Sequence, residues 1–279
     1  NVTVQLPGIN PVAEVPEVVT YVRNMADEIR DKHPNMEVRL SGMVLMNNAF
    51  AEASQSDMKN LIPLSFLLMV ITLGMMIRGL TGTAVTVVVI FGSILVAMGS
   101  GGYIGYPITP PSASAPTIIL TIAIANCVHL LVSFMHQMRR GMEKLEAMVE
   151  SMRINMQPVF LASATTAIGF LSMNFSDVPP FNHLGNMASI GVFTSFLLSM
   201  TLLPALIAIL PVRVKVSKAE DGSDMMARFG DFVVRKRRSL IWVMSAVVLI
   251  LIACVPRNEL NDVFVHYFDP SIQFRADSD

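Results

Sequence analysis

Charged residues are scarce in this sequence of 279 residues, where Asp, Glu, Lys and Arg together make up 15%. Ordinary soluble domains contain roughly 25%. The shortage is concentrated in two blocks: residues 79–138 contain no charged side chain, and residues 154–212 contain only Asp177. A helix that crosses a bilayer needs about 20 mainly apolar residues, so each block is long enough for two spans and a short turn. The composition therefore excludes an ordinary soluble domain and indicates a membrane protein.

Several catalytic motifs are also missing. The sequence has no H-E-x-x-H motif, no cysteine cluster and no G-x-x-x-x-G-K-[ST] loop, which argues against an intramembrane metalloprotease and against an attached ATPase. His129 and His136 would be nearly eclipsed on a helix, but no carboxylate accompanies them. Cys127 and Cys254 lie in apolar runs and are expected to behave as small hydrophobic residues. We therefore expect no enzyme, no metal, no cofactor and no nucleic-acid partner, and an ion gradient or a partner protein as energy source.

Six apolar runs are long enough to be membrane spans, and they predict an all-α transmembrane bundle. They cover roughly residues 61–77, 83–103, 116–135, 158–175, 184–210 and 239–255. The sequence opens on Asn1 without an initiator Met or a signal-like segment, so we expect it to be a fragment of a longer protein.

Basic residues are missing from every second loop between these runs. Loops 104–115 and 176–183 contain no Lys or Arg, whereas the alternate loops contain Arg78, Arg139, Arg140, Lys144, Arg153, Arg213, Lys215, Lys218, Arg228, Arg235, Lys236, Arg237 and Arg238. Basic residues near span ends are retained on the cytoplasmic side. We therefore expect a multi-pass protein of the bacterial inner membrane, with residues 1–60 and 257–279 in the periplasm.

The segments outside the spans predict pieces of soluble structure. In residues 1–60 the pattern favours a strand at 2–6, a helix at 16–32, a strand at 36–40 and a helix from about Asn47 that runs into the first span. This order suits the end of a larger periplasmic α+β domain. The predicted organisation continues with a bundle of five spans at 61–210, a cytoplasmic linker with an amphipathic helix at 211–238, a sixth span at 239–256, and the start of a second periplasmic domain at 257–279.

Two cytoplasmic segments have apolar residues at helical spacing. The first contains Met142, Leu145, Val149 and Met152, and the second contains Met225, Phe229, Phe232 and Val233. Such helices lie in the membrane interface or pack on the ends of a bundle, and the sequence leaves both arrangements open.

Asn126 and His129 are the main polar candidates for a functional site, because they share a helical face near the middle of the third run. Polar side chains at that depth usually face a bundle interior and are often functional. The structural alternative is a helix–helix hydrogen bond from Asn126, worth about 1 kcal/mol. Thr165, Thr166 and Asn174 in the fourth run are candidates to face the same region, although Thr often bonds its own backbone.

Small residues gather in the second run, where Gly99, Gly101 and Gly102 follow one another closely. Close contact between helices is their ordinary role. A gating hinge at residues 99–102 is the alternative.

The order of these parts resembles the resistance-nodulation-division (RND) superfamily, in particular its MMPL-like exporters of lipids or other hydrophobic compounds and the related sterol-sensing domains. The resemblance extends over nearly the whole chain. It rests on LSGMVLMNNAFAEASQSD (40–57), PITPPSASAP (107–116), ANCVHLLVSFMHQMRRG (125–141), PVFLASATTAIGFLSMNF (158–175), the LPA of 203–205 and ELNDVFVHYFDP (259–270).

The resemblance implies a molecule with two halves of six spans each, of which this chain would hold spans two to seven. The family couples export to proton entry through acidic residues in its fourth span, and the pattern Asp-x-x-His of such relatives places that acid at Asn126. An amide cannot exchange a proton in the physiological range. His129 is then the candidate that can, with Thr165 and Thr166 as further members of a proton relay, unless the missing half carries the coupling.

Two functions follow as expectations. The first is export of a lipid or other hydrophobic compound driven by the proton-motive force. The alternative, motivated by Asn126, is a lipid-sensing or scaffold protein of the same fold that does not pump; an auxiliary of protein translocation is a third and weaker alternative. The partners implied by the resemblance are membrane lipids, the hydrophobic substrate, further copies of the chain in a homo-oligomer and a periplasmic partner protein.

Overall fold

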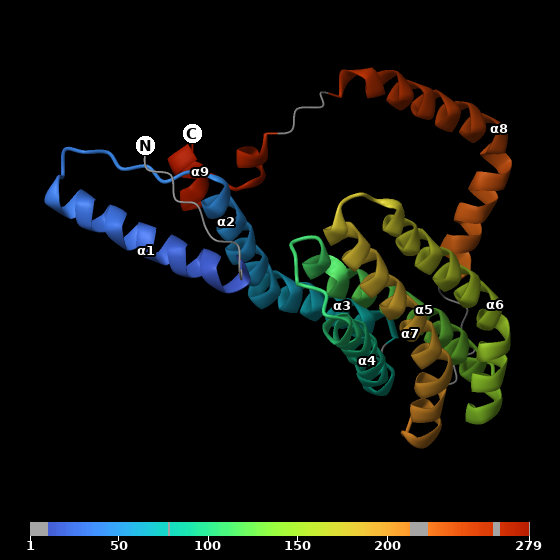
Figure 1. The fold of residues 1–279 in the computed structure, drawn as a ribbon. Coiled ribbons are helices and arrows are strands. Elements are labelled where there is room, and N and C mark those ends of the chain that lie inside the picture. Colours follow the sequence, from blue (N-terminus) through green and yellow to red (C-terminus); the bar gives the residue numbers. More distant parts are fainter. Residues whose placement is uncertain (1–10, 78, 213–222, 259–262, 279) are drawn as a thin grey trace. The chain divides into compact units, whose positions relative to one another are not determined.

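The computed structural model describes residues 11–77, 79–212, 223–258 and 263–278, and every regular element in these ranges is a helix (Figure 1). The chain divides into two compact units, Asn1–Val216 and Ser217–Asp279. Six helical stretches in the described ranges are long and apolar enough to cross a membrane. The predicted all-α transmembrane bundle with six spans is therefore confirmed.

The first unit begins with two helices that contact each other, α1 (Pro11–Lys32) and α2 (Met43–Ser56). Val19 and Ala26 of α1 share a face and are buried, as is Ala49 of α2. The predicted helix at 16–32 is present and begins five residues earlier, at Pro11, a position where the missing N–H of proline costs nothing; Pro16 lies inside the helix.

The predicted strand at residues 36–40 is wrong, because this segment has no regular secondary structure. A strand needs a hydrogen-bonded neighbour, and the neighbour that the sequence offered, at residues 2–6, lies outside the described residues. Alternation in a short run cannot supply that partner.

The first span is a direct continuation of α2, as predicted. α2 passes through a π-helical turn, Asp57–Leu61, into α3 (Ile62–Ile77) without a break. A π turn contains one extra residue per hydrogen-bonded turn and is frequent at functional sites. The helix is longer than the apolar run because its polar first half lies ahead of the apolar residues that begin at Leu61.

Four more helices complete the bundle of the first unit: α4 (Leu80–Ile104), α5 (Ala115–Arg139), α6 (Lys144–Leu171) and α7 (Pro179–Ile209). α7 contacts α4, α5 and α6, so it is the central helix. Gly105 follows the last residue of α4 with a φ angle of 85°, and Gly141 follows the end of α5 with a φ angle of 93°. Positive φ angles favour glycine. We call the end with the α5–α6 loop the basic end, and the end with the α4–α5 and α6–α7 loops the opposite end.

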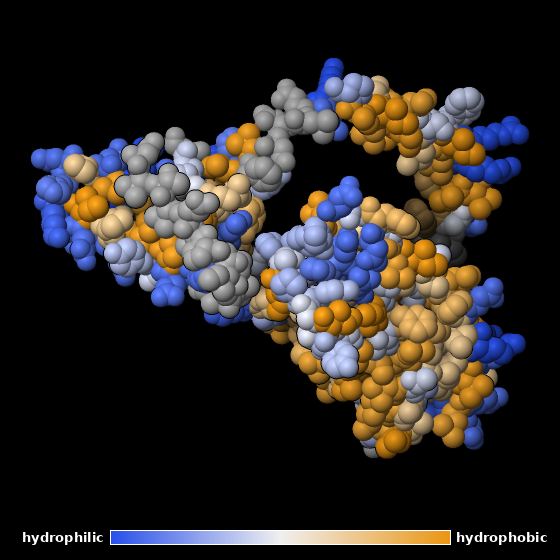
Figure 2. All heavy atoms as spheres, viewed as in Figure 1, coloured by the Kyte–Doolittle hydropathy of each residue, from blue (hydrophilic) through white to orange (hydrophobic). Residues whose placement is uncertain are grey.

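Apolar side chains cover most of the outer face of this bundle that Figure 2 presents, whereas charged side chains gather over α1. The core between the helices contains fully buried residues such as Val89, Ile119, Leu130 and Leu203. Leu64, Leu68 and other large apolar residues of α3 point outward. An apolar exterior suits lipid or further membrane helices.

The start of α6 contains the first amphipathic segment. Ala147 and Ser151 are fully buried, whereas Leu145 and Val149 are 64% and 66% exposed. The segment is one continuous helix with the fourth span. Met142 and Met152 of the predicted stripe pack against the core beside buried Met148, whereas Leu145 and Val149 face outward.

The second unit contains one long helix, α8 (Ser223–Cys254), followed by short 3₁₀ turns and α9 (Gln273–Ser278). The predicted amphipathic helix of the linker and the predicted sixth span are parts of this single helix. Phe229 and Phe232 of its amphipathic part are exposed. Phe268 and Phe274 pack edge to face, with ring centroids 5.2 Å apart.

Candidate functional site

Asn126 lies near the middle of α5, where it joins three helices. Its Nδ2 donates hydrogen bonds to Ser163 Oγ of α6 at 3.2 Å and to Ser195 Oγ of α7 at 3.1 Å. Asn126 is 4% exposed, and the two serines are more deeply buried still. The predicted location of Asn126 inside the bundle is confirmed, and the helix–helix hydrogen bond that was the structural alternative is present twice.

The Ser195 hydroxyl bonds to its own helix as well as to Asn126. Ser195 Oγ also donates to the Val192 carbonyl at 2.8 Å, a bond that satisfies the hydroxyl proton on its own helix. Its lone pairs remain available to accept from Asn126. The three side chains form a polar junction of one amide and two hydroxyls, which we call the Asn126 junction.

A shallow groove of about 220 Å³ opens beside the Asn126 junction, between α5 and α6. It is lined by Thr121, Ile122, Ala125, Asn126, His129, Pro158, Val159, Ala162, Ser163 and Thr166. His129 is exposed, so the groove gives its imidazole access to the surroundings of the bundle. Asn126, His129 and Thr166 therefore meet in one groove, as the sequence predicted; whether they relay protons stays a prediction.

The remaining polar candidates of the fourth span lie elsewhere. Thr165 donates to the Leu161 and Ala162 carbonyls of its own helix and does not line the groove. Thr166 also bonds the Ala162 carbonyl, at 2.7 Å. Asn174 lies at the opposite end of the bundle, where it exchanges hydrogen bonds with Asn186.

That opposite end contains a polar cluster that the sequence did not single out. Asn186 donates to Tyr106 Oη at 3.2 Å, and the Tyr106 ring stacks on His183 with centroids 4.5 Å apart. His183 Nδ1 is a buried atom without a hydrogen-bond partner. The cluster connects α7 to the loop that follows α4.

A second seam of hydrogen bonds between α5 and α6 was also missed. Ser151 Oγ donates to the Leu130 carbonyl at 2.7 Å, and Asn155 Nδ2 donates to Ser133 Oγ at 2.8 Å. Both Ser151 and Asn155 are buried. The available signal was spacing, because Ser151, Asn155 and Ser163 recur at multiples of four residues and so follow one ridge of α6.

The predicted glycine positions divide into two kinds. A Cβ at Gly101 would come within 3.0–3.1 Å of Met187, so this glycine lets α4 approach α7. A Cβ at Gly99 or Gly102 would meet nothing within 4 Å. α4 is an uninterrupted helix through all three positions. A hinge there stays a prediction, while close packing is present at Gly101.

Tighter contacts occur at two glycines of α7 that the sequence analysis did not name. A Cβ at Gly191 would overlap the Ile119 side chain, and a Cβ at Gly185 would overlap the Phe170 carbonyl. These positions, rather than 99–102, fix how closely α7 approaches α5 and α6.

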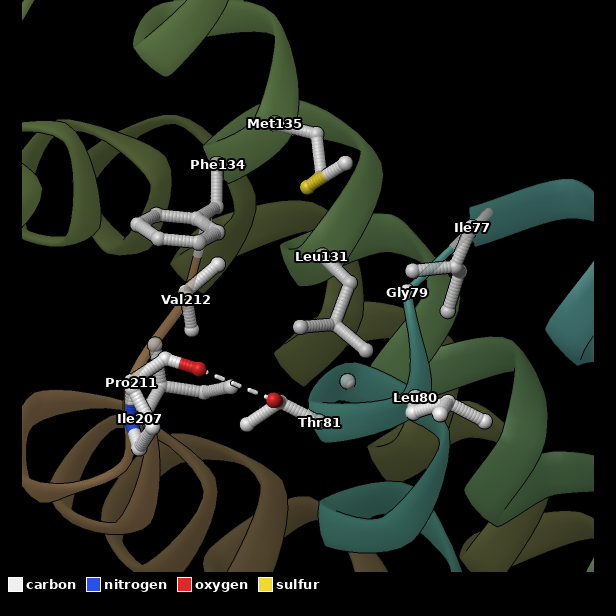
Figure 3. A pocket seen from close by; sticks show the side chains of 11 residues that line it. Ile77, Gly79, Leu80, Thr81, Leu131, Phe134, Met135, Ile207, Pro211 and Val212 are labelled. Carbon is white, nitrogen blue, oxygen red and sulfur yellow. Dashed lines mark hydrogen bonds between the residues drawn. The ribbon is translucent and has the colours of Figure 1, made fainter. Parts of the chain in front are cut away.

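A second cavity lies at the basic end, between the α3–α4 turn, α5 and the end of α7 (Figure 3). Its volume is about 450 Å³. Its lining is almost wholly apolar: Ile77, Gly79, Leu80, Thr81, Gly82, Leu131, Phe134, Met135, Ile207, Pro211 and Val212.

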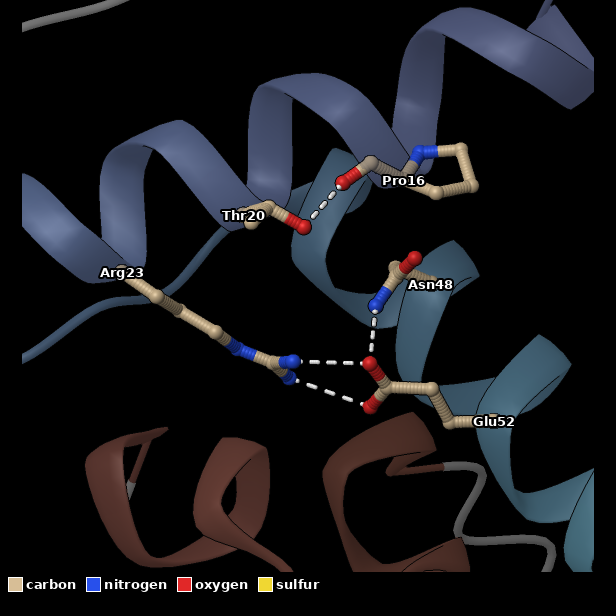
Figure 4. A network of polar contacts seen from close by, with 5 residues as sticks. All are labelled: Pro16, Thr20, Arg23, Asn48 and Glu52. Carbon is tan, nitrogen blue, oxygen red and sulfur yellow. Dashed lines mark hydrogen bonds and ion pairs between the residues drawn. The ribbon is translucent and has the colours of Figure 1, made fainter.

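A charged network joins α1 to α2 ahead of the membrane run (Figure 4). The Arg23 guanidinium donates to both carboxylate oxygens of Glu52, at 2.7 and 3.1 Å, and Asn48 Nδ2 donates to Glu52 at 2.7 Å. The bonds from Arg23 hold the pKa of Glu52 below its ordinary value. Since α2 continues into α3, this network ties α1 to the first span.

Within the described ranges, no group of three or more His, Cys, Asp or Glu side chains is arranged to hold a metal ion. The Asn126 junction has donors and hydroxyls but no carboxylate. Its chemistry is therefore hydrogen bonding, with the His129 imidazole in the neighbouring groove.

Comparison with known proteins adds a family relationship. The sequence model of the MMPL family matches residues 1–250. The chain is 29% identical over 111 residues to "Putative membrane protein MJ1562" of Methanocaldococcus jannaschii, covering 40% of this chain and 29% of that protein. It is 25% identical over 223 residues to "Probable transport protein MmpL12" of Mycobacterium tuberculosis, covering 78% and 20%. The chain thus spans well under half the length of these relatives.

Proposed function

Because this chain belongs to the MMPL family, we propose that it is part of a transporter that exports a lipid or another hydrophobic compound across the bacterial inner membrane, driven by proton entry. One observation carries the proposal: a polar junction of three helices, buried in an apolar bundle, lies beside a groove that contains His129. The similarity to "Probable transport protein MmpL12" supports a transport function.

His129 is the group that changes charge in this proposal. Protonation in the groove puts a positive charge between α5 and α6, where Asn126 and Thr166 supply oxygen atoms that can solvate it. Asn126 also holds α6 and α7, so a shift of its side chain toward the charged imidazole releases a contact with both helices. Proton entry is thereby linked to helix packing.

The proposed orientation follows from the distribution of basic residues. The α5–α6 loop with Arg139, Arg140 and Lys144 lies on the cytoplasmic side, and α1 and α2 lie in the periplasm. Figure 1 shows α2 running on into α3, which agrees with a helix that leaves the membrane without a turn. Substrate handling is assigned to the external segments and to the rest of the longer protein, including further copies in an oligomer and a periplasmic partner.

The test uses cells that express the full-length protein and retain a fluorescent phospholipid with a short acyl chain. Protonophore is expected to raise retention, and His129→Gln is expected to remove this sensitivity. His136→Gln is the matched control, because His136 is an exposed histidine of the same helix outside the groove. If the protonophore leaves retention of the fluorescent phospholipid unchanged in wild-type cells, this result contradicts proton-driven export.

The second candidate is a protein of the same fold that senses or scaffolds lipid without pumping. The observation in its favour is Asn126 itself, because an amide bonded to two serines is a structural contact that cannot exchange a proton. Asn126→Asp separates the two candidates. Protonophore-sensitive export that appears only in Asn126→Asp identifies a native protein without coupling, whereas equal export in both forms places coupling on His129 or in the rest of the protein.

A further inference from the structure

The apolar cavity at the basic end lies outside the groove of His129 and has no part in the proposed proton pathway. Its volume, about 450 Å³, falls in the range of roughly 300–1,000 Å³ that is usual for ligand sites. A cavity of this size with mainly apolar side chains has room for an apolar group.

Hydrogen bonds between helices hold the cavity open. Thr81 Oγ1 of α4 donates to the Pro211 carbonyl at 3.0 Å, and Figure 3 shows this bond crossing the floor of the cavity. Lys144 Nζ donates to the Ala208 and Leu210 carbonyls at 2.8 Å each. A cation at a helix C-terminus is favourable, so Lys144 fixes the end of α7 that forms one wall.

The cavity is open to the outside of the bundle. Leu80 on its rim is 92% exposed, and Pro211 is exposed as well. Leu131 and Phe134 on the inner wall are 1% exposed. The site therefore resembles a slot that an apolar chain enters from the surroundings of the bundle.

Positive charge lies where the slot ends. Arg139 is one helical turn beyond Met135, so the two residues share a face of α5. Arg139 and Arg140 are both exposed, and neither forms an ion pair with another described residue. Arginine binds phosphate oxygens in pairs, which suits it to a phospholipid headgroup.

We propose that this cavity binds one anionic phospholipid from the leaflet on the basic side, with an acyl chain beside Leu131 and Phe134 and the phosphate on Arg139 and Arg140. Basic pockets between membrane helices are known to favour anionic headgroups. The bound chain fills the space between the α3–α4 turn and α7. This lipid is distinct from the exported compound, so the inference does not depend on the proposed transport.

The experiment is native mass spectrometry of the full chain in detergent, titrated with phosphatidylglycerol or phosphatidylcholine of identical acyl chains. Val212→Trp fills the slot, and Ile209→Trp is its matched control, because Ile209 is 81% exposed and does not line the cavity. Arg139→Gln and Arg140→Gln, made separately, each remove one positive charge. Arg153→Gln is its control, since Arg153 pairs with Glu150 on α6.

The wild-type chain is expected to hold one phosphatidylglycerol more tightly than phosphatidylcholine, and Val212→Trp is expected to lose that lipid. Each arginine change should weaken phosphatidylglycerol roughly fivefold, and both controls should match the wild type. Equal affinity of the wild type for the two lipids would overturn the proposal. Val212→Trp that still holds the lipid tightly would also overturn it, because the lipid would then bind outside the slot. If Val212→Trp fails to fold, the arginine variants, which change exposed side chains, decide the outcome.

Discussion

Replacement of Gly191 by alanine tests whether α7 is held by steric contact with its neighbours. A Cβ at this position would overlap the Ile119 side chain of α5 and come within 3.1 Å of the Ala97 Cβ of α4. Ile119 and Ala97 are both fully buried, so neither can move into open space. Overpacking of this kind costs about 1–3 kcal/mol.

The matched control is Gly99→Ala in α4. A Cβ at Gly99 would meet nothing within 4 Å. Both changes gain the same helix propensity, about 1 kcal/mol for Gly to Ala, and this gain cancels in the comparison. Gly191→Ala should therefore be less stable than Gly99→Ala by about 1–3 kcal/mol, which for a unit of this size lowers the melting temperature by about 2–12 °C.

The chain contains a suitable reporter for this measurement. Cys127 is buried in the core of the bundle and Cys254 is exposed, and the sequence has no other cysteine. In a Cys254→Ser background, a maleimide fluorophore that reacts with Cys127 reports the opening of the bundle as temperature rises. Both glycine variants are compared in this background.

A double variant sharpens the test. Ile119→Val removes the Cδ1 methyl group and by itself should cost about 0.5–1.5 kcal/mol. In the Gly191→Ala protein the same change removes an overlapping atom, so it should cost less or restore stability, with a coupling of at least 0.5 kcal/mol. Equal melting temperatures for Gly191→Ala and Gly99→Ala, or strictly additive effects with Ile119→Val, would refute the steric argument.

Three further predictions concern polar contacts. Asn126→Ala removes two interhelical hydrogen bonds and should lower stability in the Cys127 assay by about 1 kcal/mol, since such bonds average about 0.6 kcal/mol each; no change would mean that the bonds add nothing. Lys144→Met should destabilise the end of α7 by about 0.3–1 kcal/mol, with Lys144→Arg closer to the wild type, because the cation favours the helix C-terminus. The Arg23–Glu52 contact should be present above the ordinary pKa of a glutamate and lost as the pH falls through the lowered pKa of folded Glu52. Spin labels at Glu28 and Gln55 should then show a broader distance distribution in acid, and Glu52→Gln should show it at all pH values.

The spans could be predicted from sequence because the thickness of a bilayer sets the length of an apolar run. Their ends could not. α2 with α3, α6 and α8 all extend beyond the apolar residues, since a helix outside the hydrocarbon layer needs no apolar side chains to continue. Hydropathy therefore locates the centre of each span and leaves its polar extension undetermined.

The apolar stripe at the start of α6 divides between two faces of the helix. Met142 and Met152 pack against the core, whereas Leu145 and Val149 are exposed. Between membrane helices the inner face carries small residues that allow close approach. Ala147, Ser151, Ser163 and Ala167 are buried, while Leu161 and Ile168 are exposed.

The sequence predicted that Asn126 is buried near mid-membrane, but it did not predict which residues Asn126 contacts. Asn126 is rare enough in a span to be noticed, and its position near the middle of the run indicated burial. Ser163 and Ser195 look like the other serines of their helices. Because α7 and the membrane-spanning part of α6 are apolar on every side, hydrophobic periodicity does not reveal which serine faces α5.

The strength of the polar contacts bears on whether a proton can move these helices. Four side-chain contacts join α5 to α6 and α7: Asn126 with Ser163 and Ser195, Ser151 with the Leu130 carbonyl, and Asn155 with Ser133. At about 0.6 kcal/mol each they total about 2–3 kcal/mol. One proton that crosses 100 mV and one pH unit releases about 3.7 kcal/mol. The free energy from one proton therefore exceeds the total strength of this neutral seam of amides and hydroxyls.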